Sequence, residues 1–357
     1  MSPSVPWLRQ AKRRERVTSG RSYLGRTNTG ANTGTVRTAP VLSSHLRSGV
    51  TSVLSPMTSE PPVHDFAAVV VNYNAGAALS ECVASLEREG IEAVVVVDNG
   101  STDDSLDCLA AKMPGVRVLH TGRNLGFGGG VNYGARRVAG DLLLVCNPDL
   151  VLQPGALSAM ADRLVKDPSL GLVGSALVTP AGDLQPSGRA FPTLRRSSLH
   201  AALGVLLPKN AYSRRYREVS RSRVGTGIVD WVTGACFLVR REAFDEVGGF
   251  DDRYFMYVEE VDLCWRLARA GWRTGYESSA RVIHLAGVST AAVPYRMIVA
   301  HHLSLWRFAR RTTCGSQRLL LPVVAAGIAG RCVAVCLRRV VVELGQRRWP
   351  RLRNRNG

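Results

Sequence analysis

Short apolar runs alternate with stretches of helical periodicity from Phe66 onward. The apolar runs predict strands at 66–72, 93–97, 116–120 and 141–146, and the intervening pattern predicts helices at 77–89, 102–112, 130–139 and 155–166. Strands that alternate with helices of this length are typical of βαβ crossovers onto a parallel sheet. An unbroken apolar run is expected for a parallel strand buried on both faces. The first half of the chain therefore predicts an α/β layer of the nucleotide-binding type.

The pattern changes twice in the second half of the chain. Residues 192–226 interrupt it with eight basic side chains, which favours a basic loop or a mobile helix and makes this segment a candidate lid. A second block, 228–290, returns to regular structure and includes a predicted helix near 258–270. Residues 64–290 thus form one predicted domain, and residues 291–357 turn helical and basic.

The first 63 residues have no apolar periodicity. They are rich in Ser, Thr, Gly, Arg and Pro, and such a segment cannot bury enough apolar surface to offset the entropy lost on ordering. The composition predicts a disordered basic extension. An alternative is that translation starts at Met57, a few residues before the first strand.

The positive charge lies almost entirely outside the predicted domain. The chain carries a net charge of +18, yet residues 64–304 hold 25 basic and 25 acidic residues. Residues 1–63 hold nine basic and two acidic residues, and residues 305–357 hold twelve basic and one acidic. This distribution argues against a nucleic-acid-binding body and favours basic flanks that touch an anionic surface.

The C-terminal region contains an apolar stretch from 319 to 337, interrupted by Pro322 and Arg331. A helix that spans a bilayer needs about 20 mainly apolar residues, and an arginine at its centre is costly. Three interpretations stay open: a spanning helix, an interfacial or re-entrant helix whose following arginines pair with anionic lipid headgroups, and a helical hairpin that packs on its own domain.

Cysteine usage favours a reducing compartment. The eight cysteines form no CxxC pair, and several fall inside apolar runs where Cys behaves as a small hydrophobic residue. No apolar segment follows the early basic residues as it would in a secretory signal. We therefore expect the protein in the cytoplasm.

Two carboxylates follow predicted strands. Asp149 ends the sequence Asn147-Pro148-Asp149 after the strand at 141–146, and Asp98 follows the strand at 93–97. Ligands of open α/β sheets gather at the carboxyl ends of strands, so Asp149 stands where a metal ion or a phosphate binds. Asp98 precedes turn-forming residues and a Ser or Thr helix cap. It either accepts a hydrogen bond from a base or ribose, or simply orders the turn.

Six glycines lie between 122 and 134, but they do not form a dinucleotide-binding pattern. G-x-G-x-x-G would need glycine at 131 or 133, where Val and Tyr stand, and the segment follows the third strand rather than the first. We interpret it as a loop whose glycines let the backbone approach a ligand, with Asn124 and Asn132 as polar anchors.

A third acidic group opens the predicted helix near 258. Glu259, Glu260 and Asp262 complement the positive end of the helix dipole, with Asp262 and Arg266 as an i,i+4 pair. That interpretation leaves the aromatic run at 254–257 unexplained, since aromatic walls beside a carboxylate can hold a sugar and keep a base near neutral pH. His284 ends a later strand-like segment. A single His is more often structural, but with Asp149 it offers ligands for a divalent ion.

Together these segments resemble a family 2 inverting glycosyltransferase of the GT-A fold over about residues 66–290. The resemblance rests on the following residues, in order: Val71-Asn72-Tyr73-Asn74, Asp98-Asn99-Gly100-Ser101, Asn124 with the glycine segment, Asn147-Pro148-Asp149, Gly234-Ala235, Gly249-Phe250-Asp251, Glu259-Glu260-Val261-Asp262-Leu263 and His284. It implies an α/β fold with a mixed sheet flanked by helices, followed by a basic C-terminal region that associates with a membrane.

The resemblance also implies roles for individual residues. Glu260 is the expected general base, and Asp149 and His284 are the expected ligands of a Mg²⁺ or Mn²⁺ ion. The expected nucleotide-sugar contacts are Asn72, Tyr73, Asp98, Asn99, Ser101, Asn124, Gly126 and Asn147. The expected acceptor contacts are Gly234, Ala235, Asp251, Tyr257 and Glu259. Two departures from the family pattern stand out, because Asn147 replaces the first Asp of Asp-x-Asp and Glu260 replaces an Asp.

Within the family, the Asn-Pro-Asp variant and the aromatic run before Glu259 resemble rhamnosyltransferases that use dTDP-L-rhamnose. The expected acceptor is a polyprenyl-diphosphate-linked GlcNAc used for a cell-wall linker, the expected location is the cytoplasmic face of the plasma membrane, held peripherally at its anionic surface, and no nucleic-acid partner is expected. Another sugar nucleotide and another lipid-linked or polysaccharide acceptor form the main alternative. A nucleotidyltransferase or a non-catalytic binding protein is less favoured.

Overall fold

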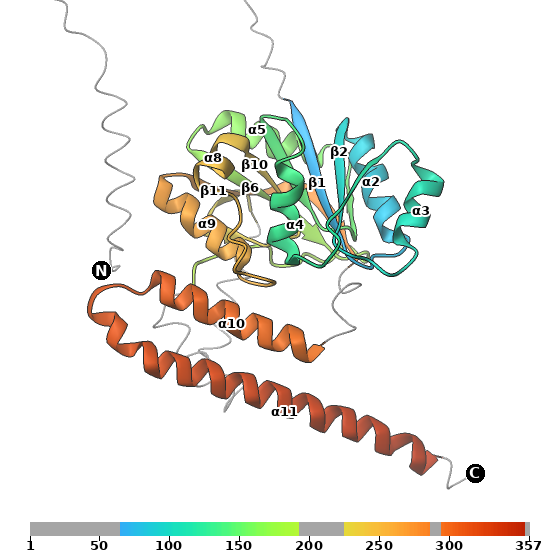
Figure 1. Cartoon of the computed structure of the whole chain (residues 1–357). Helices are drawn as coiled ribbons and strands as arrows, with labels where there is room; N and C mark the ends of the chain where they lie inside the picture. Colours follow the sequence, from blue (N-terminus) through green and yellow to red (C-terminus); the bar gives the residue numbers. More distant parts are fainter. Residues whose placement is uncertain (1–64, 193–224, 286–293, 354–357) are drawn as a thin grey trace, which may run out of the picture. The chain divides into compact units, whose positions relative to one another are not determined.

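The computed structural model describes residues 65–192, 225–285 and 294–353 of the chain (Figure 1). The expectations for residues 1–63, and nearly all of the candidate lid at 192–226, lie outside the described residues. In the first part of the α/β region, strands alternate with helices. The first three of these helices are α2 (Ala78–Arg88), α3 (Ser105–Lys112) and α4 (Gly126–Ala135), and each follows a strand of the sheet.

Four parallel strands form one half of the main sheet. β1 (Phe66–Asn72) lies between β2 (Ala93–Asp98) and β4 (Leu142–Cys146), and β3 (Arg117–His120) lies outside β2. Asn72 is in register with Asp98, and Val70 is in register with Cys146. The carboxyl ends of these strands therefore share one edge of the sheet, as the βαβ pattern predicts.

The other half of the sheet mixes strand directions. β10 (Cys236–Arg240) is antiparallel to β4 and to β6 (Leu170–Val178). β11 (Arg273–His284) is parallel to β6 and antiparallel to β5 (Leu150–Leu152) and β8 (Gly227–Val229). The mixed sheet that the family resemblance implies is confirmed. A separate pair, β7 (Gly188–Arg189) and β9 (Trp231–Val232), and three further helices complete this part: α5 (Ala156–Lys166), α8 (Arg241–Glu246) and α9 (Glu259–Ala270).

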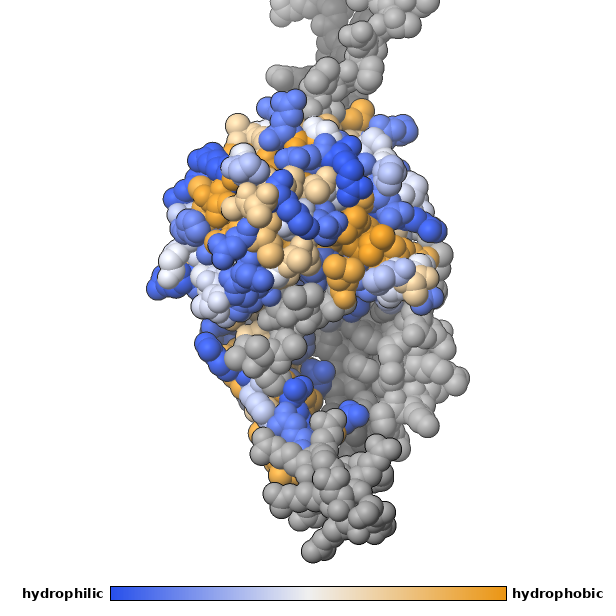
Figure 2. All heavy atoms as spheres, turned by 90° about the vertical axis from the view of Figure 1, so that its right-hand side faces the viewer, coloured by the Kyte–Doolittle hydropathy of each residue, from blue (hydrophilic) through white to orange (hydrophobic). Residues whose placement is uncertain are grey.

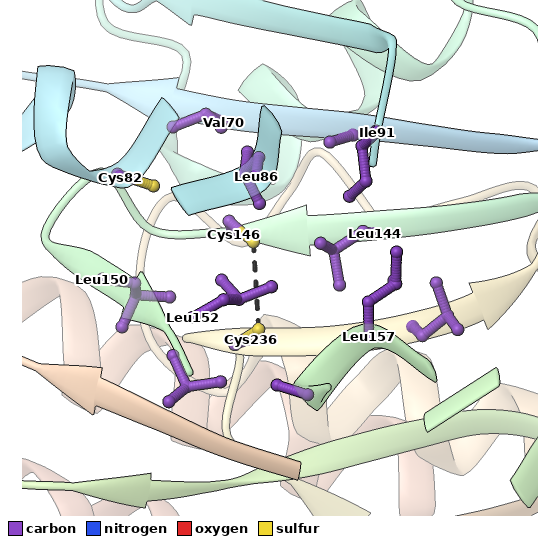
Figure 3. Packing of buried hydrophobic residues seen from close by; sticks show 14 of the residues in the cluster. Val70, Cys82, Leu86, Ile91, Leu144, Cys146, Leu150, Leu152, Leu157 and Cys236 are labelled. Atoms are coloured by element: carbon purple, nitrogen blue, oxygen red, sulfur yellow. Dashed lines mark hydrogen bonds between the residues drawn. The ribbon is translucent and has the colours of Figure 1, made fainter. Parts of the chain in front are cut away.

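Buried side chains fill both sides of the sheet. Figure 3 shows one cluster, in which Leu86 of α2 and Leu157 of α5 pack with Leu144. The thiols of Cys146 and Cys236 lie 3.8 Å apart inside it, within hydrogen-bonding distance. All eight cysteines are free, and burial raises the pKa of the Cys82 thiol well above its ordinary value. The buried cysteines thus act as small hydrophobic residues, as predicted.

The glycine segment forms a helix, which corrects the prediction of a loop followed by a helix at 130–139. α4 starts at Gly126 and ends at Ala135. A Cβ atom added at Gly130 would lie 2.7 Å from Val71, and one added at Gly134 would lie 2.7 Å from Val69. Glycine is a poor helix former, but here it lets the helix lie directly on β1 at a distance that larger side chains do not permit.

Two long helices end the described chain. α10 (Pro294–Thr312) buries Phe308 against Tyr254, Val258 and Val261, and a short 3₁₀ helix, η1 (Gly315–Leu320), leads to α11 (Leu321–Arg353). Pro322 falls in the first turn of α11, where a missing N–H costs nothing. α11 lies alongside α10, and Tyr295 of α10 donates a hydrogen bond to Glu343 of α11 at 2.9 Å (Figure 1).

The C-terminal helices keep apolar side chains exposed. Residues 315–344 form a helical segment long and apolar enough to cross a membrane, and none of its most apolar window is buried. By contrast, hydrophilic residues separate the hydrophobic ones over most of the α/β face shown in Figure 2. α10 packs on the α/β part, whereas the apolar side chains of α11, which holds most of the stretch at 319–337, remain accessible.

Candidate active site

The ends of β1 and β2 are tied together by side-chain hydrogen bonds. The buried Asn72 amide donates to Ser101 Oγ at 3.0 Å and to Ser105 Oγ at 2.9 Å, and the Ser101 N–H donates to Asp98 Oδ1 at 3.2 Å. Asp98 therefore orders the turn, the simpler of its two predicted roles. Its second oxygen, Oδ2, lies 3.4 Å from His120 Nδ1. The structure thus brings Asn72, Asp98 and Ser101 to one place, with the half-buried Tyr73 next to them in the chain.

Asn99, Asn124 and Gly126 lie together at the start of α4. The Asn99 amide donates to Asn124 Oδ1 at 3.2 Å and to the Gly126 carbonyl at 3.0 Å, and Asn99 Oδ1 accepts from the Leu125 N–H at 2.9 Å. The three residues were expected to contact a nucleotide sugar. In the structure the Asn99 side chain forms its hydrogen bonds with other protein groups. It therefore fixes the turn at the start of α4, next to Asp98.

Asp149 and His284 meet across two strands. Asp149 is 5% exposed, and its Oδ1 lies 3.6 Å from His284 Nε2. His284 Nδ1 lies 3.1 Å from the side-chain oxygen of Gln185. Sequence reasoning missed Gln185, because a single Gln in a loop carries no pattern. Within the described ranges, no group of three or more His, Cys, Asp and Glu side chains could hold a metal ion.

Asn147 and the Gly234-Ala235 segment are neighbours. The Asn147 N–H donates to the Ala235 carbonyl at 2.8 Å. A Cβ atom added at Gly234 would lie 3.5 Å from Glu260 Cβ and 3.3 Å from the Phe127 ring. Gly234 therefore leaves space directly against Glu260, and the segment joins the strand end at Asn147 to the first turn of α9.

Glu259 and Glu260 begin α9 in different environments. Burial raises the pKa of Glu260 to about 6, an effect that the nearby Arg189 guanidinium opposes. Burial and the Glu260 charge hold the pKa of Glu259 well above its ordinary value, and Glu259 Oε2 has no hydrogen-bond partner among the described residues. Two carboxyl groups whose pKa values are raised differently can play different roles at one site.

The backbone before α9 is strained. Tyr257 and Val258 have φ angles of 67° and 71°, in the left-handed region. This conformation is rare for residues with side chains and is an outlier for a β-branched one such as Val. Strain of this kind concentrates at functional sites and persists only where the surroundings hold it. Tyr257, an expected acceptor contact, is half-buried beside the first turn of α9.

α4 also supports the segment that leads to the acidic pair. Gly126 lies so close to the Phe255 carbonyl that a Cβ atom could not fit there. The Asn132 amide donates to the Phe250 carbonyl at 2.8 Å and to Asp252 at 2.7 Å, and Asn132 Oδ1 accepts from the Phe250 N–H at 2.9 Å. Asn132 was expected to anchor a ligand. This is corrected, since its side chain holds residues 250–252 on α4.

Asp251 and Asp262 belong to one ionic network. Asp251 Oδ2 accepts from Arg253 Nη2 at 2.6 Å and from Arg311 Nη1 at 2.8 Å, and the Arg253 interaction holds the pKa of Asp251 far below its ordinary value. The fully buried Asp262 accepts from Arg266 at 2.7 Å, which is the predicted i,i+4 pair, and from Arg311 at 2.6 Å. Asp251, an expected acceptor contact, is thus occupied by two arginines, and only the basic composition of the C-terminal region hinted at Arg311.

A family model and several known proteins match the chain. The model described as "Glycosyl transferase family 2" matches residues 67–248. The N-acetylglucosaminyl-diphospho-decaprenol L-rhamnosyltransferase of Mycobacterium tuberculosis is 40% identical over 253 residues, which cover 67% of this chain and 82% of that protein. The rhamnosyltransferase WbbL of Escherichia coli K12 is 33% identical over 132 residues, 37% of this chain and 47% of that protein.

One solved structure with a similar backbone is the mannosyltransferase PcManGT from Pyrobaculum calidifontis, in complex with GDP-Man and Mn²⁺. It is 16% identical, covers 79% of this chain and 81% of its own, and superposes with a TM-score of 0.48.

Proposed function

The chain belongs to glycosyl transferase family 2, and from this premise we propose that it transfers L-rhamnose from dTDP-L-rhamnose, with inversion, to a polyprenyl-diphosphate-linked GlcNAc. The chain is a glycosyltransferase by its family. The observation that carries the substrate proposal is the 40% identity to the mycobacterial L-rhamnosyltransferase over most of both chains. An unrelated donor is not favoured, because a second rhamnosyltransferase is also among the similar proteins.

Glu260 is the proposed general base. Its pKa of about 6 leaves it ionised at neutral pH, yet close enough to neutrality to accept a proton. It takes the proton from the attacking GlcNAc hydroxyl, whose oxygen forms a bond to the anomeric carbon. The bond from that carbon to the dTDP oxygen breaks with its electron pair, and attack from the opposite face inverts the centre. Gly234 lies beside Glu260 and presents no side chain to it.

Asp149 and His284 fit a divalent ion such as Mg²⁺ or Mn²⁺. A buried carboxylate oxygen 3.6 Å from an imidazole nitrogen offers two ligands of suitable type, and such ions are usually held by few protein groups, with phosphate oxygens and waters completing the shell. When bound, the ion offsets the negative charge that develops on the departing diphosphate. A backbone hydrogen bond keeps Asp149 next to His284, because the Asp149 carbonyl accepts from the N–H of Leu285, the residue after His284, at 3.0 Å.

The base of the donor is proposed to bind where β1 and β2 end. Asp98 Oδ2 is directed away from the turn and lies 3.4 Å from His120 Nδ1, and a carboxylate oxygen has a second lone pair that can accept a hydrogen bond from the imide N–H of thymine. Tyr73 is half-buried on the same edge and can line the base. Asn72, Asn99 and Asn124 contribute by fixing the backbone around Asp98.

The C-terminal helices are proposed to hold the enzyme peripherally on the cytoplasmic face of the plasma membrane, where the lipid-linked acceptor lies. Val333, Leu337, Val341 and Leu344 are exposed and recur at helical spacing along α11. Arg338 and Arg339 lie beside them, and the basic residues that follow in the sequence can pair with anionic lipid. Exposed apolar side chains and nearby arginines supply the two attractions, insertion of apolar groups and charge, that hold a helix at a membrane interface.

The test is transfer with purified full-length protein, a panel of sugar nucleotides and a polyprenyl-diphosphate-GlcNAc acceptor, with and without EDTA. We expect product with dTDP-L-rhamnose and loss of product with EDTA. Transfer from a different sugar nucleotide would replace the donor, and hydrolysis of the donor without transfer would reject the acceptor. Activity that persists in EDTA and in the Asp149→Asn variant would reject the metal.

A further inference from the structure

Helix α10 contacts the segment that carries Glu260 at several separate points. Ser304 Oγ donates to the Met256 carbonyl at 3.1 Å, and the His301 ring packs edge-on against the Tyr257 ring with 5.3 Å between centroids. Phe308 is buried among side chains of the same segment. α10 lies next to α9 in Figure 1, so the C-terminal region forms one wall of this part of the molecule.

Arg311 makes the charged contacts between α10 and this segment. Its Nη1 donates to Asp251 at 2.8 Å and to Asp262 at 2.6 Å, so one guanidinium joins the turn before the aromatic run to the first turn of α9. Asp262 has no exposed surface, and it also accepts from Tyr254 Oη at 3.2 Å and Arg266 Nε at 2.7 Å. Charge-assisted hydrogen bonds to a buried carboxylate are short and directional, so this network fixes the position of Asp262.

The position of Asp262 sets the position of Glu260. The two residues are two positions apart in the first turn of α9, so a shift of one backbone carries the other with it. The strained residues Tyr257 and Val258 immediately precede this turn. A strained backbone relaxes unless its neighbours hold it, and on this side the neighbours are Ser304, which binds the Met256 carbonyl, and His301, which packs on Tyr257.

We propose that Arg311 is a positioning residue for Glu260, and that α10 is therefore a part of the active site and not only a link to the membrane. The proposal rests on the proposed function in one respect, namely that Glu260 is the base. Arg311 touches neither substrate nor reacting atoms in this assignment. It acts through Asp262 and Asp251, which it holds in a fixed relation to each other.

The first experiment compares Arg311→Met with Arg310→Met in the full chain. Arg310 is the adjacent residue, is exposed, and lies over the Trp306 ring at 5.9 Å, away from the network. We expect Arg311→Met to lower kcat by about 10- to 100-fold, since a small misplacement of a catalytic group has effects of this size. KM for the sugar nucleotide should change by less than about threefold, and Arg310→Met should behave like wild type. Arg311→Lys should recover part of the loss, because it restores the charge but not the planar fork.

The pH profile separates positioning from a general loss of stability. The charged groups that act on Glu260 are Glu259 on α9 and Arg189 on β7, whereas Arg311 binds Asp262 and Asp251. Without Arg311 the first turn of α9 is held less firmly and water reaches Glu260 more easily, so the pKa of Glu260 should fall toward its ordinary value and the acid limb of kcat should move to lower pH. A loss of stability alone, which lowers only the amount of folded enzyme, leaves the acid limb in place.

Hydrogen exchange provides a readout that does not depend on turnover. We expect amides of residues 254–262 to exchange faster in Arg311→Met than in Arg310→Met. Unchanged exchange, with wild-type kcat per folded molecule and an unshifted pH profile, would overturn the proposal even if the melting temperature falls. If the wild-type protein transfers no rhamnose, the proposed function fails, and the exchange comparison still decides whether Arg311 holds this segment.

Discussion

The α/β part buries most of its apolar residues, whereas the C-terminal helices leave many of theirs exposed. Residues 64–304 are electrically neutral as a sequence, and the sheet buries its apolar residues in two clusters. Of the large hydrophobic residues that are exposed in the described chain, only Val165, Leu184 and Leu285 belong to the α/β part, and the other eleven lie on α10, η1 and α11. Burial of apolar surface drives folding, so the first region is stabilised by its own core, whereas the second has apolar surface left over for a partner.

The contrast also shows where the two regions depend on each other. α11 has little contact with the sheet, but α10 shares Phe308 and Arg311 with the segment that leads into α9. We have proposed that the chemistry takes place in the α/β part and that α11 contacts the membrane, and α10 connects the two regions.

Replacing the base should abolish the chemistry and leave binding in place. Glu260→Gln keeps the size of the side chain but cannot accept the acceptor proton, and loss of a general base costs roughly 10²- to 10⁴-fold in rate. Sugar-nucleotide affinity, measured by calorimetry, should stay within about threefold, because the interaction lost is one made in the transition state. Glu92→Gln, at an exposed position of the α/β part, is the matched control. Normal turnover in Glu260→Gln would remove this residue from its role.

Charges placed on α11 should separate membrane contact from catalysis. Leu337 and Val341 are 60% and 68% exposed, and each apolar side chain contributes about 1.5–3 kcal/mol when it enters an apolar phase. The double variant Leu337→Glu with Val341→Glu should therefore bind anionic vesicles more weakly by at least about 100-fold. Its rate with a short-chain, water-soluble acceptor should match wild type.

Val165→Glu provides the control for the same change of charge on the α/β part, where the side chain is 40% exposed. It should bind vesicles like wild type. If the α11 double variant bound vesicles as tightly as the wild type, α11 would not be the part of the chain that contacts the membrane. Release of the wild-type protein by high salt would favour interfacial contact over a spanning helix, since electrostatic attraction to lipid is screened.

The glycines of α4 test how closely the α/β part is packed. Gly134→Ala puts a methyl group 2.7 Å from Val69 and 2.8 Å from Val97, and overpacking of a core costs about 1–3 kcal/mol. We expect a lower free energy of unfolding by denaturant titration. Gly115→Ala is the matched control, because nothing lies within 4 Å of a Cβ atom at Gly115. An unchanged stability of Gly134→Ala would mean that α4 can move away from β1.

The sequence predicted the four parallel strands β1 to β4 well, because strand and helix periods differ there and each apolar run is several residues long, but it did not predict β5 and β6. It failed at α4, since glycine propensity argues against a helix and only the surface of β1 explains one. Asn99 and Asn132 could not be assigned to protein contacts for a related reason. Their partners, Gly126 and Phe250, become neighbours only through the fold. Arg311 could not be distinguished in the sequence from the many other arginines of the C-terminal region. Its contact with Asp262 exists only because α10 packs beside α9.

The smallest predicted effect is a pH-dependent stabilisation by Glu260→Gln. The folded pKa of Glu260, about 6, lies above its ordinary value of 4.5 because burial disfavours the charged form. The stability of the wild type should therefore fall as pH rises from 4.5 through 6, where the folded protein must give up a proton that the unfolded chain releases more readily.

Gln carries no charge at any pH. The melting temperature of Glu260→Gln should then exceed that of wild type by about 2–4 °C at pH 8, and the difference should shrink toward zero near pH 4.5. Glu92→Gln should show a constant difference across the same range. A constant difference for Glu260→Gln as well would show that water reaches the Glu260 carboxylate in the folded protein and that its pKa is not raised. The α/β part would then leave this acid as accessible to solvent as the side chains of the C-terminal helices.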